Sequence, residues 1–211
     1  MSDAPMPPEE LRRRLSREEI NALPLRHYEG EVKLIRAAEE WREALPALRS
    51  ERALGFDTET RPTFRKGKKN DPALIQLAPA DAAYLIQLGG LPFNEEIAAL
   101  LADPGIIKVG VGIREDMQGL ARIHPFAPAG LVDLGDLARA LDLPSRGLRT
   151  LAASLFGWRI SKGPQCSNWS APQLSPRQVA YAATDAWIGR MIYLRLKELG
   201  LEAPPDPVDP A

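Results

Sequence analysis

The sequence predicts an α/β fold whose central sheet mixes parallel and antiparallel strands. Three apolar runs, 53–57, 73–78 and 83–88, follow one another with polar connections between them, which is the pattern of successive strands. The apolar run 106–111 is then followed by helical periodicity over 114–123. Clustered strands followed by alternating strands and helices are typical of a mixed sheet covered by helices. The crossover around 106–111 makes part of this sheet parallel.

Capping residues and periodicity indicate the other elements. Asn94 can cap a helix that runs to about Leu101. Ser175 followed by Pro176 is a strong helix start, because Ser supplies a cap and Pro fits the first helical position. The helix that begins there is expected to reach about Leu199. The remaining predicted elements are strands at 31–36 and 130–133 and helices at 37–48, 134–140 and 148–156.

The chain divides into three predicted parts, of which one is a folded domain. A length of 211 residues suits a single domain with a substantial core. Residues 1–28 are rich in proline and charge, and we expect a loosely attached N-terminal extension with one short helix. Residues 29–201 carry the periodic segments and form the predicted domain. Residues 202–211 are expected to form a disordered C-terminal tail, because EAPPDPVDPA has too few apolar side chains to pack.

Composition and charge exclude several classes of protein. Hydrophobic residues make up 45% of the chain and charged residues 26%, which is the range of soluble globular proteins. No apolar run approaches the roughly 20 residues of a membrane helix, and the N-terminus has no apolar secretory segment. One cysteine excludes an internal disulfide framework. We therefore expect a cytoplasmic protein with no membrane partner and no obligate protein partner. The net charge of −1 neither indicates nor excludes a nucleic-acid partner, because local patches decide such contacts.

Acidic residues in three separate segments point to one site. Asp57 and Glu59 follow an apolar strand and, being two apart, share one face of it. Tyr181 and Asp185 are four apart and share one face of the last helix. Asp116 stands on the helix after 106–111. Each acid alone has an ordinary structural explanation, such as a solvated turn or a first-turn acid that favours the helix dipole.

Carboxylates that converge need a positive charge between them, and a metal ion can supply it. Oxygen ligands select hard cations such as Mg²⁺ or Mn²⁺. Two such ions about 3.5–4 Å apart can activate a water on one side of a phosphodiester and stabilise the leaving oxygen on the other. The Tyr181 hydroxyl could orient the attacking water from the same helix face as Asp185.

Three motifs in this order resemble the four-acid (DEDD) superfamily of exonucleases. FDTET at 56–60 resembles the first motif, KVGVGIREDMQGL at 108–120 the second and YAATDAWIG at 181–189 the third. The tyrosine four residues before the last acid, with Ala180 where one branch has histidine, resembles the tyrosine branch. From about 33 to 198 the sequence is also similar to the Werner-syndrome helicase exonuclease domain and, more distantly, to ribonuclease D.

The resemblance implies a fold and a role for each key residue. The fold would be ribonuclease H-like, with a mixed five- to six-stranded sheet flanked by helices, and residues 29–201 would be a 3′-5′ exonuclease domain. Asp57 would bridge two metal ions, Glu59 and Asp185 would complete the first site, and Asp116 would serve the second. Tyr181 would position the attacking water. The reaction would release 5′-mononucleotides from 3′ ends of DNA, RNA or both.

Six residues are candidate contacts to the nucleic acid. The basic loop 61–69 follows the first acidic strand, so it either contacts substrate phosphates or is merely solvated. A second basic group lies around 146–162. An aromatic ring ahead of the last helix either stacks on a base or packs that loop against the helix. The candidates are Thr58, Arg65, Lys66, Arg146, Lys162 and Trp169.

Other functions stay open at this point. A catalytically weak nucleic-acid-binding module would bind tightly without metal-dependent release of nucleotides. A hydrolase for small nucleotides or very short oligomers would slow sharply as its substrate lengthened. Gly110 and Gly112 after a strand invite a dinucleotide-binding interpretation, but the third small residue of that motif is replaced by Glu115.

Overall fold

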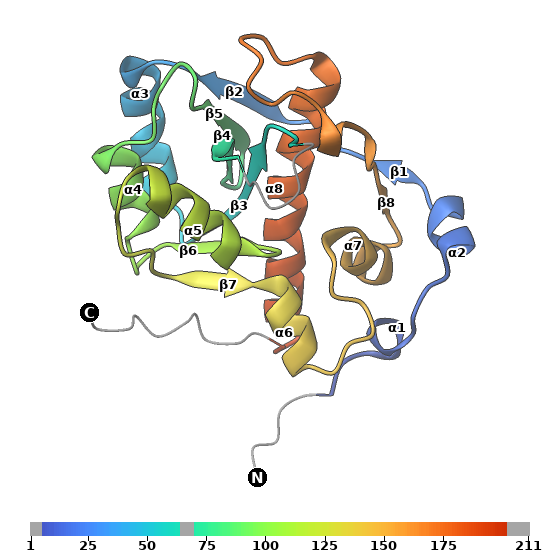
Figure 1. Cartoon of the computed structure of the whole chain (residues 1–211). Coiled ribbons are helices and arrows are strands. Elements are labelled where there is room, and N and C mark those ends of the chain that lie inside the picture. The colour runs from blue at the N-terminus through green and yellow to red at the C-terminus, as the bar shows by residue number, and fades with distance from the viewer. Residues whose placement is uncertain (1–5, 64–69, 202–211) are drawn as a thin grey trace.

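The predicted mixed α/β architecture is confirmed in a computed structural model, which describes residues 6–63 and 70–201. Within these residues the main sheet has six strands in the order β2-β5-β4-β3-β6-β7 (Figure 1). The two candidate contacts Arg65 and Lys66 lie outside the described residues, as does the predicted tail 202–211.

The strands pair in both directions, as the clustering of apolar runs predicts. The strands are β2 (Glu31–Ile35), β3 (Ala53–Thr60), β4 (Pro72–Ala78), β5 (Ala82–Gln87), β6 (Ile107–Gly110) and β7 (Leu131–Asp133). Strand β4 runs antiparallel to both β3 and β5. Strands β6 and β7 continue the sheet parallel to β3, and β2 is parallel to β5. The carboxyl end of β3 therefore lies beside the carboxyl ends of its parallel neighbours.

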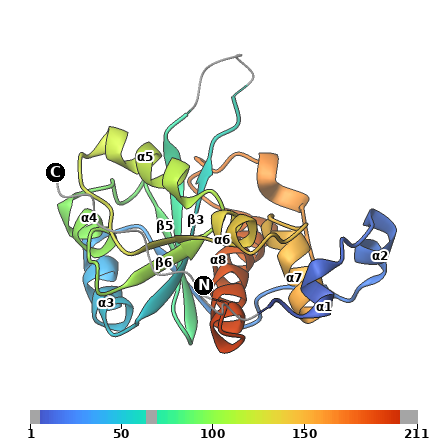
Figure 2. The same cartoon turned by 90° about the horizontal axis from the view of Figure 1, so that it is seen from below.

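Helices cover both faces of the sheet (Figure 2). One face packs against α3 (Ala38–Arg49), α4 (Glu95–Leu101) and α5 (Ile113–Ile123) in a core that includes Leu54 and Phe56 of β3. The other face packs against α6 (Leu134–Ala140), α7 (Leu148–Phe156) and α8 (Pro176–Glu198). The alternation of residues along β3 thus separates an apolar face from the face that carries the acids.

Helix α8 approaches β3 closely because small residues meet at their contact. A Cβ placed on Gly55 would lie 1.9 Å from the backbone oxygen of Ala186, so only glycine fits there. Ala182 and Ala183, on the same helix, are fully buried. The close approach brings the side chains of α8 to the level of the acids on β3.

The predicted helix starts are confirmed by their caps. Asn94 accepts a hydrogen bond from the Ile97 backbone N–H at 3.1 Å. Ser175 and Gln178 form a capping box at the start of α8, with Pro176 at its first position. Helix α8 ends at Glu198, one residue before the expected end. Among the residues that the structure describes, no helix is both long and apolar enough to cross a bilayer.

The N-terminal segment differs from the loosely attached extension expected from sequence. Residues 6–28 form α1 (Glu9–Arg12), α2 (Arg17–Ala22) and β1 (Leu25–Arg26), which pairs in parallel with β8 (Arg159–Ile160). Leu11 is buried against α7 in the second core. The Tyr28 backbone N–H donates to the Thr184 hydroxyl of α8 at 2.9 Å. The Leu11 side chain, the Tyr28 ring against Trp187 and a few backbone hydrogen bonds hold the segment, and such isolated anchors leave no periodic signal. The division at residue 28 stays a prediction.

Candidate active site

Two acids stand at the carboxyl end of β3, on the face that meets α8. Asp57 lies opposite Gln76 and Glu59 opposite Leu74 in the antiparallel ladder with β4, so both point to the same side as Gly55. Glu59 is buried, with 8% of its surface exposed. The register shifts between Glu59 and Thr60, where the strand ends. The backbone of a central strand therefore fixes both carboxylates.

Tyr181 and Asp185 face these acids from α8. The two side chains are hydrogen-bonded to each other, as their spacing of one helical turn allows. Asp185 is buried, with 7% of its surface exposed, and its charge raises the pKa of both Asp57 and Glu59. The phenol and three carboxylates thus share one hollow.

Asp116 joins the group through a threonine. It lies in the first turn of α5, which begins after Gly112 in the left-handed conformation at φ 74°. The Thr58 hydroxyl donates to Asp116 Oδ1 at 2.7 Å, and the Thr58 backbone N–H donates to Asp57 Oδ1 at 2.8 Å. Thr58, predicted as a nucleic-acid contact, here links two of the acids. Asp57, Glu59, Asp116, Tyr181 and Asp185 are thus neighbours in this arrangement, and their catalytic and metal-binding roles stay predictions.

The surroundings of the four carboxyl groups disfavour their charged form. Burial, and then the charge of Asp185, raises the pKa of Asp57 well above its usual range. The same causes raise the pKa of Glu59 to about 8. Burial raises the pKa of Asp116 to about 6, and the pKa of Asp185 to about 7 against the opposing hydrogen bond from Tyr181. A cation among these groups would relieve both their repulsion and their loss of hydration.

The donor set fits a hard divalent cation. All the candidate ligands are carboxylate oxygens, which suit Mg²⁺ or Mn²⁺ and not softer metals. In residues 6–63 and 70–201, however, no three side chains among His, Cys, Asp and Glu already surround a common point at which one ion would sit. The acids are nonetheless neighbours, carried by β3, α5 and α8.

Basic residues border this hollow, which has a volume of about 500 Å³. Arg149 of α7 and Lys162 lie on its wall together with the acids. The Arg149 Nε–H donates to the Ile160 backbone oxygen at 2.7 Å, and its charge lowers the pKa of Asp185. Arg146, the other predicted cation, is exposed and lines an adjoining groove. The site therefore combines an acidic floor with a basic edge, which suits a phosphate held beside metal ions.

Trp169 packs inside the protein and does not present a face to a base. Only 1% of its surface is exposed, and its ring centroid lies 6.0 Å from that of Tyr181. Its indole N–H donates to the Gln165 backbone oxygen at 3.4 Å. The prediction of a base contact at Trp169 does not hold in this arrangement, because the ring fills the space between its loop and α8.

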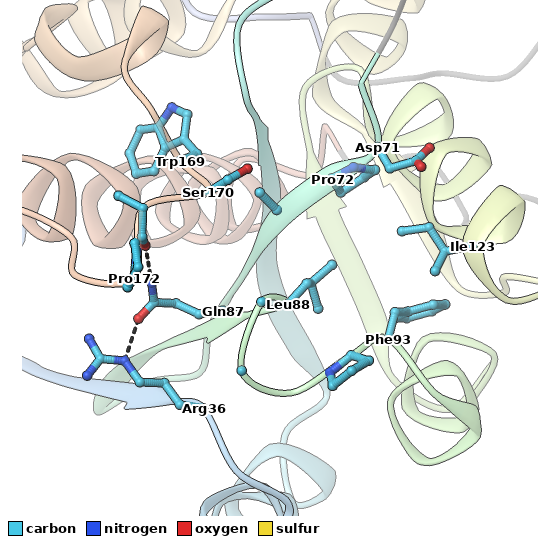
Figure 3. Close-up of a pocket in the computed structure, with 15 residues that line it drawn as sticks. Arg36, Asp71, Pro72, Gln87, Leu88, Phe93, Ile123, Trp169, Ser170 and Pro172 are labelled. Atoms are coloured by element: carbon cyan, nitrogen blue, oxygen red, sulfur yellow. Dashed lines mark hydrogen bonds between the residues drawn. The ribbon is translucent and has the colours of Figure 1, made fainter.

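A second hollow of about 500 Å³ lies apart from the acids (Figure 3). Its wall includes Leu88, Phe93 and Ile123. At one end the Arg36 Nε–H donates to the Gln87 side-chain oxygen, and the Gln87 amide donates to the Ala171 backbone oxygen at 3.3 Å. The bond from Gln87 fastens the loop that follows Trp169 to the carboxyl end of β5.

Comparison with known proteins agrees with this geometry. A model of the 3′-5′ exonuclease family matches residues 32–200. The chain belongs to the 3′-5′ exonuclease family. The resemblance to the Werner helicase exonuclease and to ribonuclease D is thereby confirmed, and so is the ribonuclease H-like fold. The five key residues all fall inside the matched span, on β3, α5 and α8.

Two members of this exonuclease family and one solved structure show the degree of similarity. Bifunctional 3′-5′ exonuclease/ATP-dependent helicase WRN of Mus musculus is 34% identical over 153 residues, covering 70% of this chain and 11% of that protein. Exonuclease 3′-5′ domain-containing protein 2 of Homo sapiens is 35% identical over 173 residues, covering 74% of this chain and 28% of that protein. The crystal structure of Escherichia coli RNase D, an exoribonuclease involved in structured RNA processing, has a TM-score of 0.72 at 26% identity. The match covers 81% of this chain and 45% of that one. The chain thus spans less than a third of the length of the two sequence relatives.

Sequence reasoning missed some residues of the acidic hollow. Gln165 and Thr150 line the acidic hollow, but a lone amide or hydroxyl in a loop or helix carries no pattern that predicts it. Arg149 belongs to the basic group expected around 146–162. Its place beside Asp185 follows from how α7 packs on α8.

Proposed function

We propose that this chain is a metal-dependent 3′-5′ exonuclease that hydrolyses phosphodiester bonds of DNA, RNA or both. The observation that carries the proposal is the meeting of four carboxylates from β3, α5 and α8 beside one tyrosine hydroxyl. Burial raises the pKa of each carboxyl group, and the charges of neighbouring acids raise it further for Asp57 and Glu59. Carboxyl groups with pKa values raised in this way lower the stability of the fold, so they are expected where they bind a cation or act on a substrate.

Two divalent ions, Mg²⁺ or Mn²⁺, are the proposed cofactors. Asp57, Glu59 and Asp185 would hold one ion, and Asp57 and Asp116 the other. When bound, such a pair lowers the pKa of water and stabilises the charge that develops on the phosphate. Thr58 supports the ligand set by holding Asp116 and Asp57 through its hydroxyl and backbone N–H.

Tyr181 is proposed to position the attacking water. Burial, and then the negative charge of Asp185, raises the pKa of its hydroxyl, so it stays protonated and acts as a hydrogen-bond partner. The hydroxyl is held against Asp185, at the edge of the hollow that holds the acids. A water held in line with the scissile bond gains from orientation alone, and cleavage at the terminal linkage releases a 5′-mononucleotide.

A charged substrate end fits the basic edge of the site. Arg149 and Lys162 stand where they can meet phosphate oxygens, and charge-assisted hydrogen bonds to phosphate are strong. The family relationship to E. coli RNase D supports a nucleic-acid substrate. We therefore propose that the 3′ end of the strand lies over the acids while its phosphates meet the basic edge.

The test is a cleavage assay on 5′-labelled single-stranded DNA, recessed duplex DNA and RNA of one sequence. Each substrate is incubated with Mg²⁺, with Mn²⁺ and with chelator. A metal-dependent ladder that shortens from the 3′ end is expected. The matched control is Asp57→Asn, which keeps shape and hydrogen bonding but removes the charge of the central ligand, and it should leave 3′ ends intact.

Two results would contradict the proposal. Activity retained in Asp57→Asn would remove the two-metal mechanism. A mobility shift on every substrate without any ladder would instead indicate a nucleic-acid-binding module with weak catalysis.

A further inference from the structure

The adjoining groove that Arg146 lines has a volume of about 550 Å³ and opens directly beside the acidic hollow. Both hollows are bordered by Arg149, Thr150 and Lys162, so the two are continuous at these residues. One wall of the groove is the loop before α7, from Pro144 to Arg146. The other wall is the N-terminal segment around α2, which contributes Arg14, Leu15, Arg17, Ile20 and Asn21.

Among the described residues, the groove is lined by five cations and by no acidic side chain. The cations are Arg14, Arg17, Arg146, Arg149 and Lys162. A nearby acid, Glu19, is already engaged, since it pairs with Arg13 at 2.7 Å and caps the Ser16 backbone. In the part of the chain that the structure describes, Arg14, Arg17, Arg146 and Lys162 form no ion pair with an acid. Cations gathered in a groove without counter-charges favour a polyanionic ligand.

The N-terminal wall is fixed in place and does not depend on a flexible arm. Leu11 is 2% exposed in the second core, just before the arginines. After them, α2 begins with a capping box at Ser16, and β1 is hydrogen-bonded to β8. Figure 1 shows α1, α2 and β1 in a row beside α7 and β8. Arg14 and Arg17 therefore face the groove from a backbone anchored on both sides.

We propose that Arg14 and Arg17 form the outer wall of a channel for the sugar-phosphate backbone upstream of the scissile linkage. The inference rests on the proposed exonuclease function, because it assumes a strand whose 3′ end lies over the acids. The acidic floor repels the phosphates that follow the terminal nucleotide, and the adjoining groove is where cations can neutralise them. Both arginines precede residue 32, where the family match begins, so this wall is a feature of the present chain and not of the matched domain.

The proposal predicts that affinity depends on strand length. A mononucleotide ester occupies the acidic hollow alone, whereas longer strands extend into the groove. Each phosphate contact on a single strand adds about 0.7 to the slope of log affinity against log salt concentration. Loss of both arginines should lower that slope by about 1.4 and weaken binding of long strands on the order of tenfold at 0.1 M salt.

The experiment compares R14A/R17A with R42A/R49A, which removes the same charge from α3 on the opposite face of the sheet. Binding of fluorescent single strands of two to twelve nucleotides is measured over a salt series, with each pair placed in an Asp57→Asn background to prevent cleavage. Turnover of the p-nitrophenyl ester of thymidine 5′-phosphate is measured with Asp57 intact. We expect R14A/R17A to lose the gain in affinity with length while keeping ester turnover within about twofold. R14K/R17K should restore the salt slope, since it keeps both charges, and R42A/R49A should match the parent.

Each other outcome has a defined meaning. If R14A/R17A binds long strands with the parental affinity and salt slope, the channel proposal fails while the proposed function stands. If the variant alters inhibition by a 5′-mononucleotide but not the binding of long strands, the groove holds product and the proposal is overturned. If the parent neither cleaves nor binds any nucleic acid, the proposed function fails first. Thermal melting of all variants checks that the exposed substitutions leave the fold intact.

Discussion

The acidic hollow and the basic groove adjoin each other but are built in opposite ways. The acids are short side chains on regular elements, with Glu59 and Asp185 buried, and the central strand β3 fixes Asp57 and Glu59 by its register with β4. The cations are long side chains on an N-terminal segment, a loop and the start of α7, and all but Arg149 are exposed. A short side chain reaches its target only from one backbone position, while a long one tolerates many.

This difference explains why the two regions contribute differently to function. Metal chemistry needs ligands held within a few tenths of an ångström, which buried elements of a rigid sheet can supply. Binding of a phosphate backbone needs charge density more than geometry. We therefore expect changes in the acidic hollow to act on the rate of cleavage, and changes in the groove to act on affinity and on its salt dependence.

Of the substitutions that test this comparison, Tyr181→Phe is expected to have the largest effect, which is on the rate of cleavage. The ring keeps its contact with Trp169, at 6.0 Å between centroids, but the hydroxyl that is hydrogen-bonded to Asp185 is lost. Single-turnover cleavage should slow by about 10²-fold because the attacking water loses its orientation. Mn²⁺ affinity, measured by calorimetry, should stay within a few-fold. An unchanged rate would mean that Tyr181 only packs against the loop at Trp169.

Stability of the metal-free protein should fall as pH rises from about 5 to 8. The folded state holds the pKa of Glu59 at about 8 and that of Asp185 at about 7, above the ordinary values of 4.5 and 3.8. Between these values the folded chain keeps protons that the unfolded chain releases, so the free energy of unfolding decreases with pH. This loss in the free energy of unfolding is absent below the ordinary pKa values and complete above about pH 8.

Thermal melting in chelator checks this sign. We expect the Tm at pH 8.5 to lie several degrees below that at pH 5.5, since about 1 kcal/mol shifts Tm by about 2–4 °C in a chain of this size. Glu59→Gln should reduce this difference in Tm because it removes one titrating charge. Added Mn²⁺ should reduce the same difference in the parent protein. A Tm that rises with pH in chelator would show that the acids are not repelled in the folded state.

The smallest expected effect belongs to Lys162, which borders both hollows. Lys162→Ala should reduce the salt slope for single-strand binding by about 0.7 and weaken affinity a few-fold, because one phosphate contact is lost. The matched control is Lys33→Ala on the edge strand β2, where Lys33 pairs with Glu31 at 3.4 Å. A change in single-turnover rate with unchanged affinity would place Lys162 with the acids and break the comparison between the two regions.

The sequence by itself determined the fold class and the acids of the site. Alternation along 53–60 places Asp57 and Glu59 on one face, and the four-residue spacing of Tyr181 and Asp185 places them on one face of a helix. These are local periodicities, which survive in any arrangement of the chain. Ser175 and Asn94 likewise cap their helices through contacts within a few residues, so the helix starts could be predicted.

Only the tertiary structure decided which distant segments meet. Burial of Trp169 depends on the space between its loop and α8, and the role of Thr58 depends on the distance from β3 to α5. Arg14 and Arg17 reach the groove because Leu11 packs against α7, whose residues come more than a hundred positions later. No local pattern carries these contacts, since each follows from packing between elements that the sequence keeps far apart.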